Sequence, residues 1–201
     1  MRIISGTCRG RKLATLKGMS IRPTSDRVRE SIFNIIAQSV YGADVLDLFA
    51  GTGAFGLECL SRGASMTLFV DISRDSCSVI RNNIELCKFT SNAVVLQYDA
   101  LKLNLPENII SKQVHTGINQ VDNHKQLLCP FNLIFLDPPY EMGFVEKTLK
   151  NSALLHYVGE DSLMIVEHSF KEKIPDDLQM VDIQDQRQYG KTLVSFLKLR
   201  C

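Results

Sequence analysis

Four consecutive residues in the second half of the chain, Asp137, Pro138, Pro139 and Tyr140, could hold a flat amine. They follow the apolar run FNLIFL, so they leave the carboxyl end of an expected strand. Two prolines fix φ, stiffen the turn and set the direction of its carbonyl groups. Asp137 and the Pro138 carbonyl can then accept from one exocyclic NH₂ group, while the Tyr140 ring stacks on the attached base.

An amine conjugated to an aromatic ring is a poor nucleophile. Acceptors that hold its hydrogens turn the lone pair towards an incoming group, and they stabilise the positive charge that develops on nitrogen. We therefore predict a catalytic corner for transfer to an exocyclic amine. A plain Asp-Pro turn is the alternative.

A glycine-rich loop lies upstream, in VLDLFAGTGAFGLE, where Gly51, Gly53 and Gly56 follow an expected strand and open a helix. Glycines at this spacing permit a tight turn and let a ligand lie against bare backbone. Asp71 ends the next expected strand, at the separation where an acidic residue holds ribose hydroxyls. The pattern predicts a cofactor that contains a nucleoside.

Asp47 distinguishes between such cofactors. Its carboxylate ends the first strand beneath the loop, where it would repel a pyrophosphate and attract an ammonium or sulfonium group. S-adenosylmethionine carries both cations and no phosphate, so we predict this methyl donor rather than NAD. Asp99 could accept from the adenine amino group, or it could be a helix N-cap or turn carboxylate. The predicted donor-binding residues are Asp47, Ala50, Gly51, Thr52, Gly53, Gly56, Asp71, Ile72, Asp99 and Ala100.

A parallel sheet would bring these residues together. Helical patterns alternate with apolar runs, which indicates βαβ units. Two last strands flank a turn at Gly190 and should add antiparallel pairing at one side. The expected strands are 43–50, 66–71, 92–100, 131–137, 162–168, 178–186 and 191–199, and the expected helices are 23–38, 53–63, 73–88 and 144–156.

Charge is unevenly distributed along a chain whose net charge is only +1. The first 30 residues hold eight basic and two acidic groups, so a basic head precedes an acidic body. Such asymmetry predicts a polyanionic partner at the head. A solvated, unstructured tail is the alternative, but apolar residues at strand spacing favour short strands around a basic turn.

Other features exclude several classes of protein. None of the six cysteines forms a C-x-x-C pair, and neither a secretory signal nor a membrane-spanning run is recognisable. We therefore expect a reduced, cytoplasmic protein.

Residues 106–130 are polar and lack a clear period, which predicts a mobile insertion. The spacing of His115, His124 and Cys129 in this segment matches no metal template, so we expect no metal site.

Several stretches together resemble one family. RIISGTCRGRKL, IRPTSDRVRESIFN, the glycine loop, LDPPY and RQYGKTLVSF are similar to the bacterial methyltransferases that modify guanine N2 in 16S ribosomal RNA. The resemblance implies a Rossmann-like class I α/β fold, with a seven-stranded, mostly parallel sheet, one antiparallel strand and a small N-terminal β-hairpin. It implies a methyltransferase domain over 23–201 and RNA binding by the extension 1–22. The predicted RNA-binding residues are Arg2, Arg9, Arg11, Lys12, Arg22 and Arg27.

Two other functions stay open. The DPPY motif also occurs in DNA adenine-N6 and cytosine-N4 methyltransferases. Such enzymes usually need a separate recognition domain, and few residues precede the core here to form one. A non-catalytic RNA-binding protein on this scaffold would be expected to lose Asp137 or the glycines. The sequence identifies neither the target guanine nor whether free 16S rRNA or an assembling small subunit is the substrate.

Overall fold

The computed structural model describes residues 1–16, 26–105, 130–178 and 180–200. Predictions for Arg22 and for nearly all of the polar insertion 106–130 lie outside these ranges. Pro130 alone of that insertion is described, and it leads directly into a strand. The predicted boundary between the head and the methyltransferase domain also lies outside the described residues.

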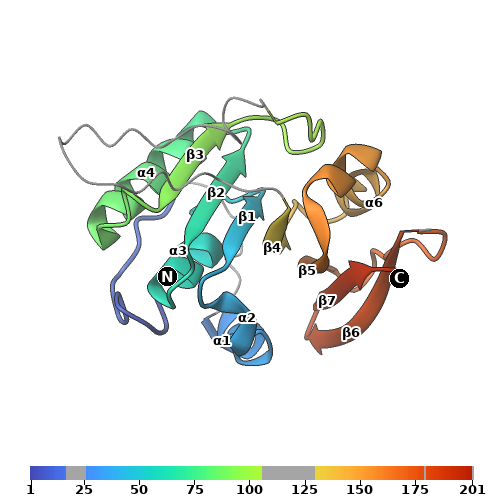
Figure 1. The fold of residues 1–201 in the computed structure, drawn as a ribbon, viewed down its shortest axis with the longest axis horizontal. Coiled ribbons are helices and arrows are strands. Elements are labelled where there is room, and N and C mark those ends of the chain that lie inside the picture. Colours follow the sequence, from blue (N-terminus) through green and yellow to red (C-terminus); the bar gives the residue numbers. More distant parts are fainter. Residues whose placement is uncertain (17–25, 106–129, 179, 201) are drawn as a thin grey trace.

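Seven strands form one sheet in the order β3-β2-β1-β4-β5-β7-β6, which crosses the molecule from end to end (Figure 1). Strand β7 runs antiparallel to both of its neighbours, whereas the other neighbouring strands pair in parallel. The predicted mostly parallel sheet with one antiparallel strand is therefore confirmed. The strands are β1 (Asp44–Leu48), β2 (Met66–Asp71), β3 (Ala93–Gln97), β4 (Phe131–Leu136), β5 (Val158–Ser169), β6 (Val181–Tyr189) and β7 (Thr192–Leu199).

Helices cover both faces of the sheet, which explains why its central strands are apolar almost throughout. One apolar cluster joins the sheet to α1, α3 and α4, and the other joins it to α6 and η1. On β1, Val45 enters the first cluster and Leu46 enters the second. The helices are α1 (Asp26–Ile35), α2 (Ala37–Val40), α3 (Ala54–Ser61), α4 (Arg74–Cys87), α6 (Phe144–Leu149) and the 3₁₀ helix η1 (Ser152–His156).

Single residues set some boundaries that periodicity alone misplaces. The helix predicted over 144–156 is divided into α6 and η1 at Asn151, whose Oδ1 accepts the Ala153 N–H at 3.0 Å. The strand predicted over 43–50 ends at Leu48, because Phe49 adopts a left-handed conformation with φ of 59°. Both interruptions come from single residues inside otherwise regular patterns.

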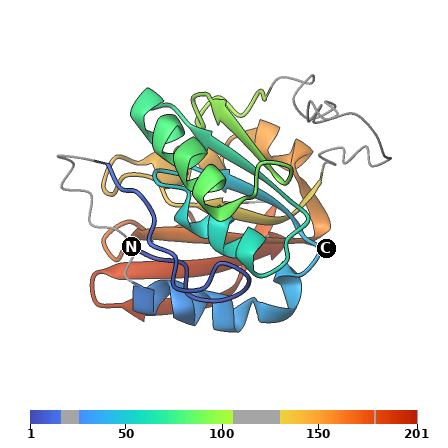
Figure 2. The same ribbon diagram turned by 90° about the vertical axis from the view of Figure 1, so that its left-hand side faces the viewer.

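The predicted N-terminal hairpin is a closed loop rather than two regular strands. Ile3 N donates to Arg11 O at 3.0 Å, and one isolated bridge joins Arg2 to Lys12. The second of the short strands expected around the basic turn does not form at residues 13–16, where Ala14 bonds through its N–H and its carbonyl to the Asn83 side chain of α4. Figure 2 shows this loop, in blue, on the outside of the helical layer.

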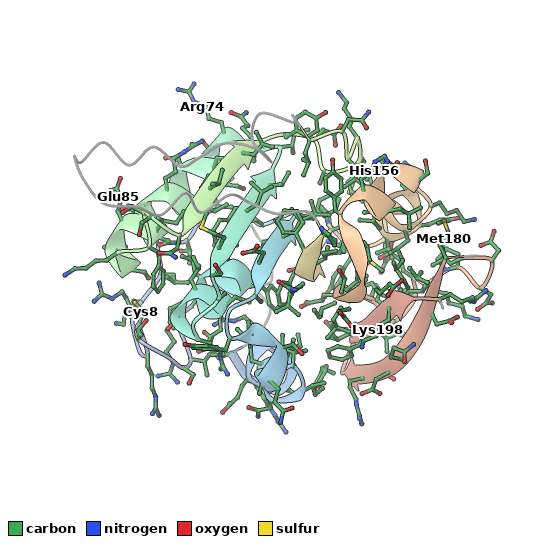
Figure 3. All side chains as sticks on the ribbon, viewed as in Figure 1. Cys8, Arg74, Glu85, His156, Met180 and Lys198 are labelled. Carbon is green, nitrogen blue, oxygen red and sulfur yellow. The ribbon has the colours of Figure 1, made fainter. Side chains whose placement is uncertain are left out.

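A buried carboxylate anchors the loop. The Glu58 side chain on α3 is fully buried and accepts from Ile4 N at 2.7 Å and Ser5 N at 2.9 Å. Ile3 and Leu13 are buried in the apolar cluster of α1, α3 and α4. Cys8 lies beside the C-terminal end of α4 (Figure 3), where its thiol donates to Cys87 O at 3.4 Å. Residues 1–16 are therefore folded onto the domain and do not form an unstructured tail.

Close approach at Gly6 gives a direct test of this docking. A Cβ at Gly6 would lie 1.8 Å from Ser61 O, and the residue has a φ of 80°. We expect Gly6→Ala to lower the free energy of unfolding, measured in urea, by about 2–4 kcal/mol. Gly10→Ala is the matched control, because Gly10 has the same φ of 80° but no atom within 4 Å. Equal losses in the two variants would contradict tight docking at Gly6.

Candidate active site

The carboxyl ends of the central strands meet at one edge of the sheet, where open α/β folds bind their ligands. Leu48 at the end of β1 pairs with Val70 of β2 and with Leu136 of β4. The glycine-rich loop after β1 and the Asp137–Tyr140 corner after β4 are therefore neighbours.

Asp47 lies beneath the glycine loop, as predicted, and only 1% of it is exposed. Its Oδ2 accepts the Gly56 N–H at 3.0 Å, which fixes the start of α3 over the end of β1. Gly56 has to be a glycine, because a Cβ there would lie 2.3 Å from the Phe69 ring of β2. The third glycine of the motif thus serves close packing of helix on strand.

Burial changes the ionisation of Asp47. Desolvation raises its pKa to about 8, the negative charge of Asp71 adds to the rise, and the Gly56 hydrogen bond opposes it. At neutral pH the carboxyl group is therefore mostly protonated until a cation comes close. The sequence suggested a permanent negative charge here, but burial removes water from the carboxyl group and so favours its neutral form.

Asp71 ends β2 and ties the glycine loop to that strand. Its Oδ2 accepts Gly51 N at 2.8 Å and its Oδ1 accepts Ser73 N at 2.8 Å. Each carboxylate oxygen can accept more than one hydrogen bond, so Asp71 keeps capacity for a hydroxyl group. A Cβ at Gly51 would meet only Phe49 O at 3.9 Å, so the loop exposes bare backbone there.

The other predicted donor contacts lie on the same edge. Ala50, Thr52 and Gly53 belong to the loop after β1, and the Asn83 side chain of α4 donates to Thr52 O at 3.0 Å. Ile72 follows β2 and is exposed.

After β3, Asp99 Oδ1 accepts Leu101 N at 3.1 Å, so the role of a turn carboxylate is present. An adenine contact by Asp99 stays a prediction. Ala100 beside it is buried.

Hydrogen bonds of the Tyr140 hydroxyl attach the DPPY corner to β5 and β7. Asp137 and Pro138 follow β4 directly, Pro139 is exposed, and Tyr140 is 39% exposed. The Tyr140 hydroxyl donates to Glu167 Oε1 at 2.8 Å and lies 3.0 Å from Thr192 Oγ1. Burial, followed by the negative charge of Glu167, raises the pKa of Tyr140, so the phenol stays protonated and remains a donor.

Glu167 and Thr192 also belong to this site, although the sequence-based predictions did not include them. Glu167 is buried in β5, within the run SLMIVEH. A charged residue inside an apolar strand needs a buried partner, and this signal could have identified it. No comparable signal marks Thr192.

Backbone strain also concentrates here. Phe49 has a positive φ although it is not glycine, and such conformations cluster at functional sites. Its ring stacks on Phe144, the first residue of α6, with ring centroids 6.2 Å apart and an interplanar angle of 19°. The stack joins the glycine loop to the segment that follows the DPPY corner.

Five of the six basic residues predicted to bind RNA are described. Arg2 pairs with Asp26 at 3.2 Å, and the Arg11 guanidinium donates to Leu86 O at the end of α4. Arg9 and Lys12 are exposed on the docked loop, and Arg27 is exposed on α1. The loop thus presents several cations from a fixed framework.

Removing the Tyr140 hydroxyl should destabilise this corner. Tyr140→Phe takes one donor away from the buried Glu167 carboxylate, so we expect a loss of about 1–3 kcal/mol in the free energy of unfolding. Tyr41→Phe is the control, because Tyr41 is 84% exposed. Urea titrations in which both variants match the wild type would argue against a buried hydrogen bond at Tyr140.

Membrane-spanning helices and metal clusters are both absent from the described ranges. No helix there has the length and apolar character needed to cross a membrane. Among the residues that the structure describes, no three His, Cys, Asp or Glu side chains are grouped as a metal site.

The sheet order and the glycine loop after β1 define a Rossmann-like class I methyltransferase. The solved structure of the candidate methyltransferase yhhF from Escherichia coli matches 100% of this chain and 98% of its own, with a TM-score of 0.78 and 29% identity. The chain belongs to the family described as Conserved hypothetical protein 95, whose model matches residues 1–198.

Curated relatives carry more specific names. The chain is 31% identical over 175 residues to the ribosomal RNA small subunit methyltransferase D of Escherichia coli K12, which covers 87% of this chain and 78% of the relative. It is 32% identical over 200 residues to the candidate rRNA methyltransferase YlbH of Bacillus subtilis, with full coverage of both chains.

Proposed function

We propose that this protein transfers a methyl group from S-adenosylmethionine to the exocyclic N2 amine of a guanine in 16S ribosomal RNA. The observation that carries the proposal is the DPPY corner beside the glycine loop, since β4 and β1 are paired up to Leu136 and Leu48. The names of the relatives support the substrate class, because one of them is a ribosomal RNA small subunit methyltransferase.

The residues of the glycine loop fit the donor. Bare backbone at Gly51 leaves room for a ligand, and Asp71 lies at the end of β2 to accept from ribose hydroxyls. A protonated Asp47 can ionise beneath a sulfonium or ammonium group, whereas a pyrophosphate would oppose that ionisation. When bound, S-adenosylmethionine would supply an electrophilic methyl group, with S-adenosylhomocysteine as the leaving product and one proton of the amine released to solvent.

The DPPY residues would hold the acceptor. In this proposal the Asp137 carboxylate and the Pro138 carbonyl accept the two hydrogens of the amine, so that its lone pair faces the donor. The Tyr140 ring stacks on the guanine, and Glu167 with Thr192 keeps that ring in place. The stiff turn through Pro138 and Pro139 keeps both acceptors oriented, which is the preorganisation that amine methylation requires.

A direct assay separates this function from its alternatives. Protein and donor labelled in the methyl group are incubated with 16S rRNA, with small subunits and with DNA, and the digested nucleosides are identified by mass spectrometry. We expect label in N2-methylguanosine. Label in N6-methyladenine or N4-methylcytosine of DNA would favour the DNA enzyme, and donor binding or RNA binding without transfer would favour the non-catalytic protein.

The docked head should contribute to RNA affinity by neutralising phosphates. Arg9→Ala with Lys12→Ala should lower the log–log salt slope of RNA binding by roughly 0.7–0.9 for each phosphate that is no longer neutralised. Arg11 is less suitable for this test, because its guanidinium also donates to Leu86 O and its loss would remove that contact as well as a charge. Deleting the whole head would remove Ile3 and Leu13 from the core, so point substitutions are the better test.

The control removes equal charge elsewhere. Lys198→Ala with Arg200→Ala changes two cations, one near the end of β7 and one just beyond it in an ion pair with Asp182, which should leave the salt slope as it is. A slope that is equally shallow in both double variants, or unchanged in the Arg9 and Lys12 variant, would count against RNA binding by the head.

A further inference from the structure

Exposed apolar side chains gather next to the DPPY corner. Tyr140, Met142 and Phe170 are 39%, 55% and 43% exposed. The Tyr140 hydroxyl lies 3.0 Å from Thr192 Oγ1 at the start of β7, and Phe170 N donates to Lys191 O at 2.9 Å, one residue earlier. Two segments that are distant in the sequence thus present large apolar groups beside the start of β7.

Hydrogen bonds join these segments into one surface. Ser169 Oγ donates to Glu141 Oε1 at 3.4 Å, and Gly143 N donates to Glu172 Oε1 at 3.3 Å. Ser169 also pairs with Thr192 across β5 and β7. We call this surface the hairpin rim, made of residues 140–143, 169–172 and 190–192. It includes part of the RQYGK turn, to which the proposed function gives no role.

Two lysines of the rim are close to Phe170 along the backbone. Lys171 follows it in sequence, and the Lys191 carbonyl accepts its backbone N–H. Lys171 forms a loose ion pair of 3.6 Å with Glu141, and both of these side chains are more than half exposed. The rim therefore combines an exposed aromatic side chain with two exposed lysines, one adjacent in sequence and one joined to it through the backbone. Hydrogen bonds to Glu141 and Glu172 link its loops.

We propose that the hairpin rim binds the RNA strand next to the target guanine, with Phe170 stacked on a flanking base and Lys191 on a phosphate. The inference rests on the proposed function and extends it to residues outside the DPPY corner and the basic head. A base that leaves its stack to enter the corner exposes its neighbours. An aromatic platform with adjacent cations suits such unstacked nucleotides. The rim is continuous with Tyr140, so a strand that delivers guanine to the corner passes over it.

Substitution at Phe170 separates stacking from simple apolar contact. We expect Phe170→Leu to raise the KM for 16S rRNA about tenfold, and Phe170→Tyr to restore it. Lys191→Gln should lower the log–log salt slope of kcat/KM by roughly 0.7–0.9. Ile183→Ala on β6 is the matched control for Phe170→Leu. Lys198→Gln, near the end of β7 that lies opposite Lys191, is the control for Lys191→Gln, and neither should change KM.

Different results would contradict the RNA-binding role of the hairpin rim and the proposed methyltransferase function. If wild-type protein methylates 16S rRNA while Phe170→Leu and Lys191→Gln match it in KM and salt slope, the rim has no RNA role. Loss of self-association in Phe170→Leu with unchanged KM would instead make the rim a contact between copies of the chain. Absence of methyl transfer by the wild type overturns the proposed function itself. Donor affinity and melting temperature verify folding, and Lys191→Gln tests the rim independently if Phe170→Leu folds poorly.

Discussion

Asp137→Asn is expected to lower the turnover of rRNA methylation by roughly a hundredfold or more, the range for loss of one preorganised polar partner. The substitution keeps the shape of the side chain but removes the negative charge that would face the developing positive charge on the amine. The backbone should keep its course, because Pro138 and Pro139 still restrict it. Affinity for the donor and for the RNA should therefore change little.

Single-turnover kinetics give the measurement, with donor binding followed by calorimetry and RNA binding by filter retention. Asp161→Asn is a matched control, because Asp161 is an exposed aspartate on β5. A single-turnover rate near that of the wild type would remove Asp137 from the chemistry. Weak donor binding in Asp137→Asn would instead indicate a structural role in the donor site.

Donor binding should also depend on pH through Asp47. Because burial raises the pKa of Asp47 to about 8, its carboxyl group holds a proton at neutral pH, and binding a cation should release that proton. Affinity for S-adenosylmethionine should therefore increase as the pH rises towards about 8 and then level off. Asp47→Asn should bind the donor at least tenfold more weakly, since roughly 1.4 kcal/mol of charge interaction suffices for that factor.

Calorimetry across pH 6–9 in buffers of different ionisation enthalpy measures the released proton. The amino group of the donor titrates in both proteins, so the difference between wild type and Asp47→Asn isolates Asp47. A variant with the pH profile of the wild type would show that Asp47 does not couple to the donor.

The raised pKa of Asp47 should affect stability in the opposite direction. A rise in pH should strengthen donor binding but lower the free energy of unfolding. A carboxyl group whose pKa is raised from 3.8 to about 8 binds more protons in the folded than in the unfolded state between those values. Its contribution to the free energy of unfolding is therefore present at low pH and is lost as the pH rises towards about 8. Asp47→Asn should lack this loss and so be more stable than the wild type at high pH. Urea titrations at pH 6 and pH 9 measure the difference.

Local physical chemistry made much of this protein predictable from its sequence. Apolar runs of strand length alternate with helical periods, so the strand predicted over 66–71 matches β2 residue for residue. Glycine spacing located the loop after β1, and the order of Asp137, Pro138, Pro139 and Tyr140 located the corner after β4. Each of these signals lies within a few neighbouring residues, where steric limits and periodicity act directly.

Tertiary structure alone decided the contacts between distant residues. Tyr140 and Glu167 are 27 positions apart, and Ile4 and Glu58 are 54 apart, so no local pattern pairs them. The same holds for the pKa of Asp47, because the packing of surrounding elements removes water from its carboxyl group. Composition marked the head as basic, but long-range contacts, among them those of the buried Glu58 and the close approach at Gly6, show that residues 1–16 are docked. Burial and long-range hydrogen bonding depend on which elements meet in the folded chain, and that information does not lie in any short stretch of sequence.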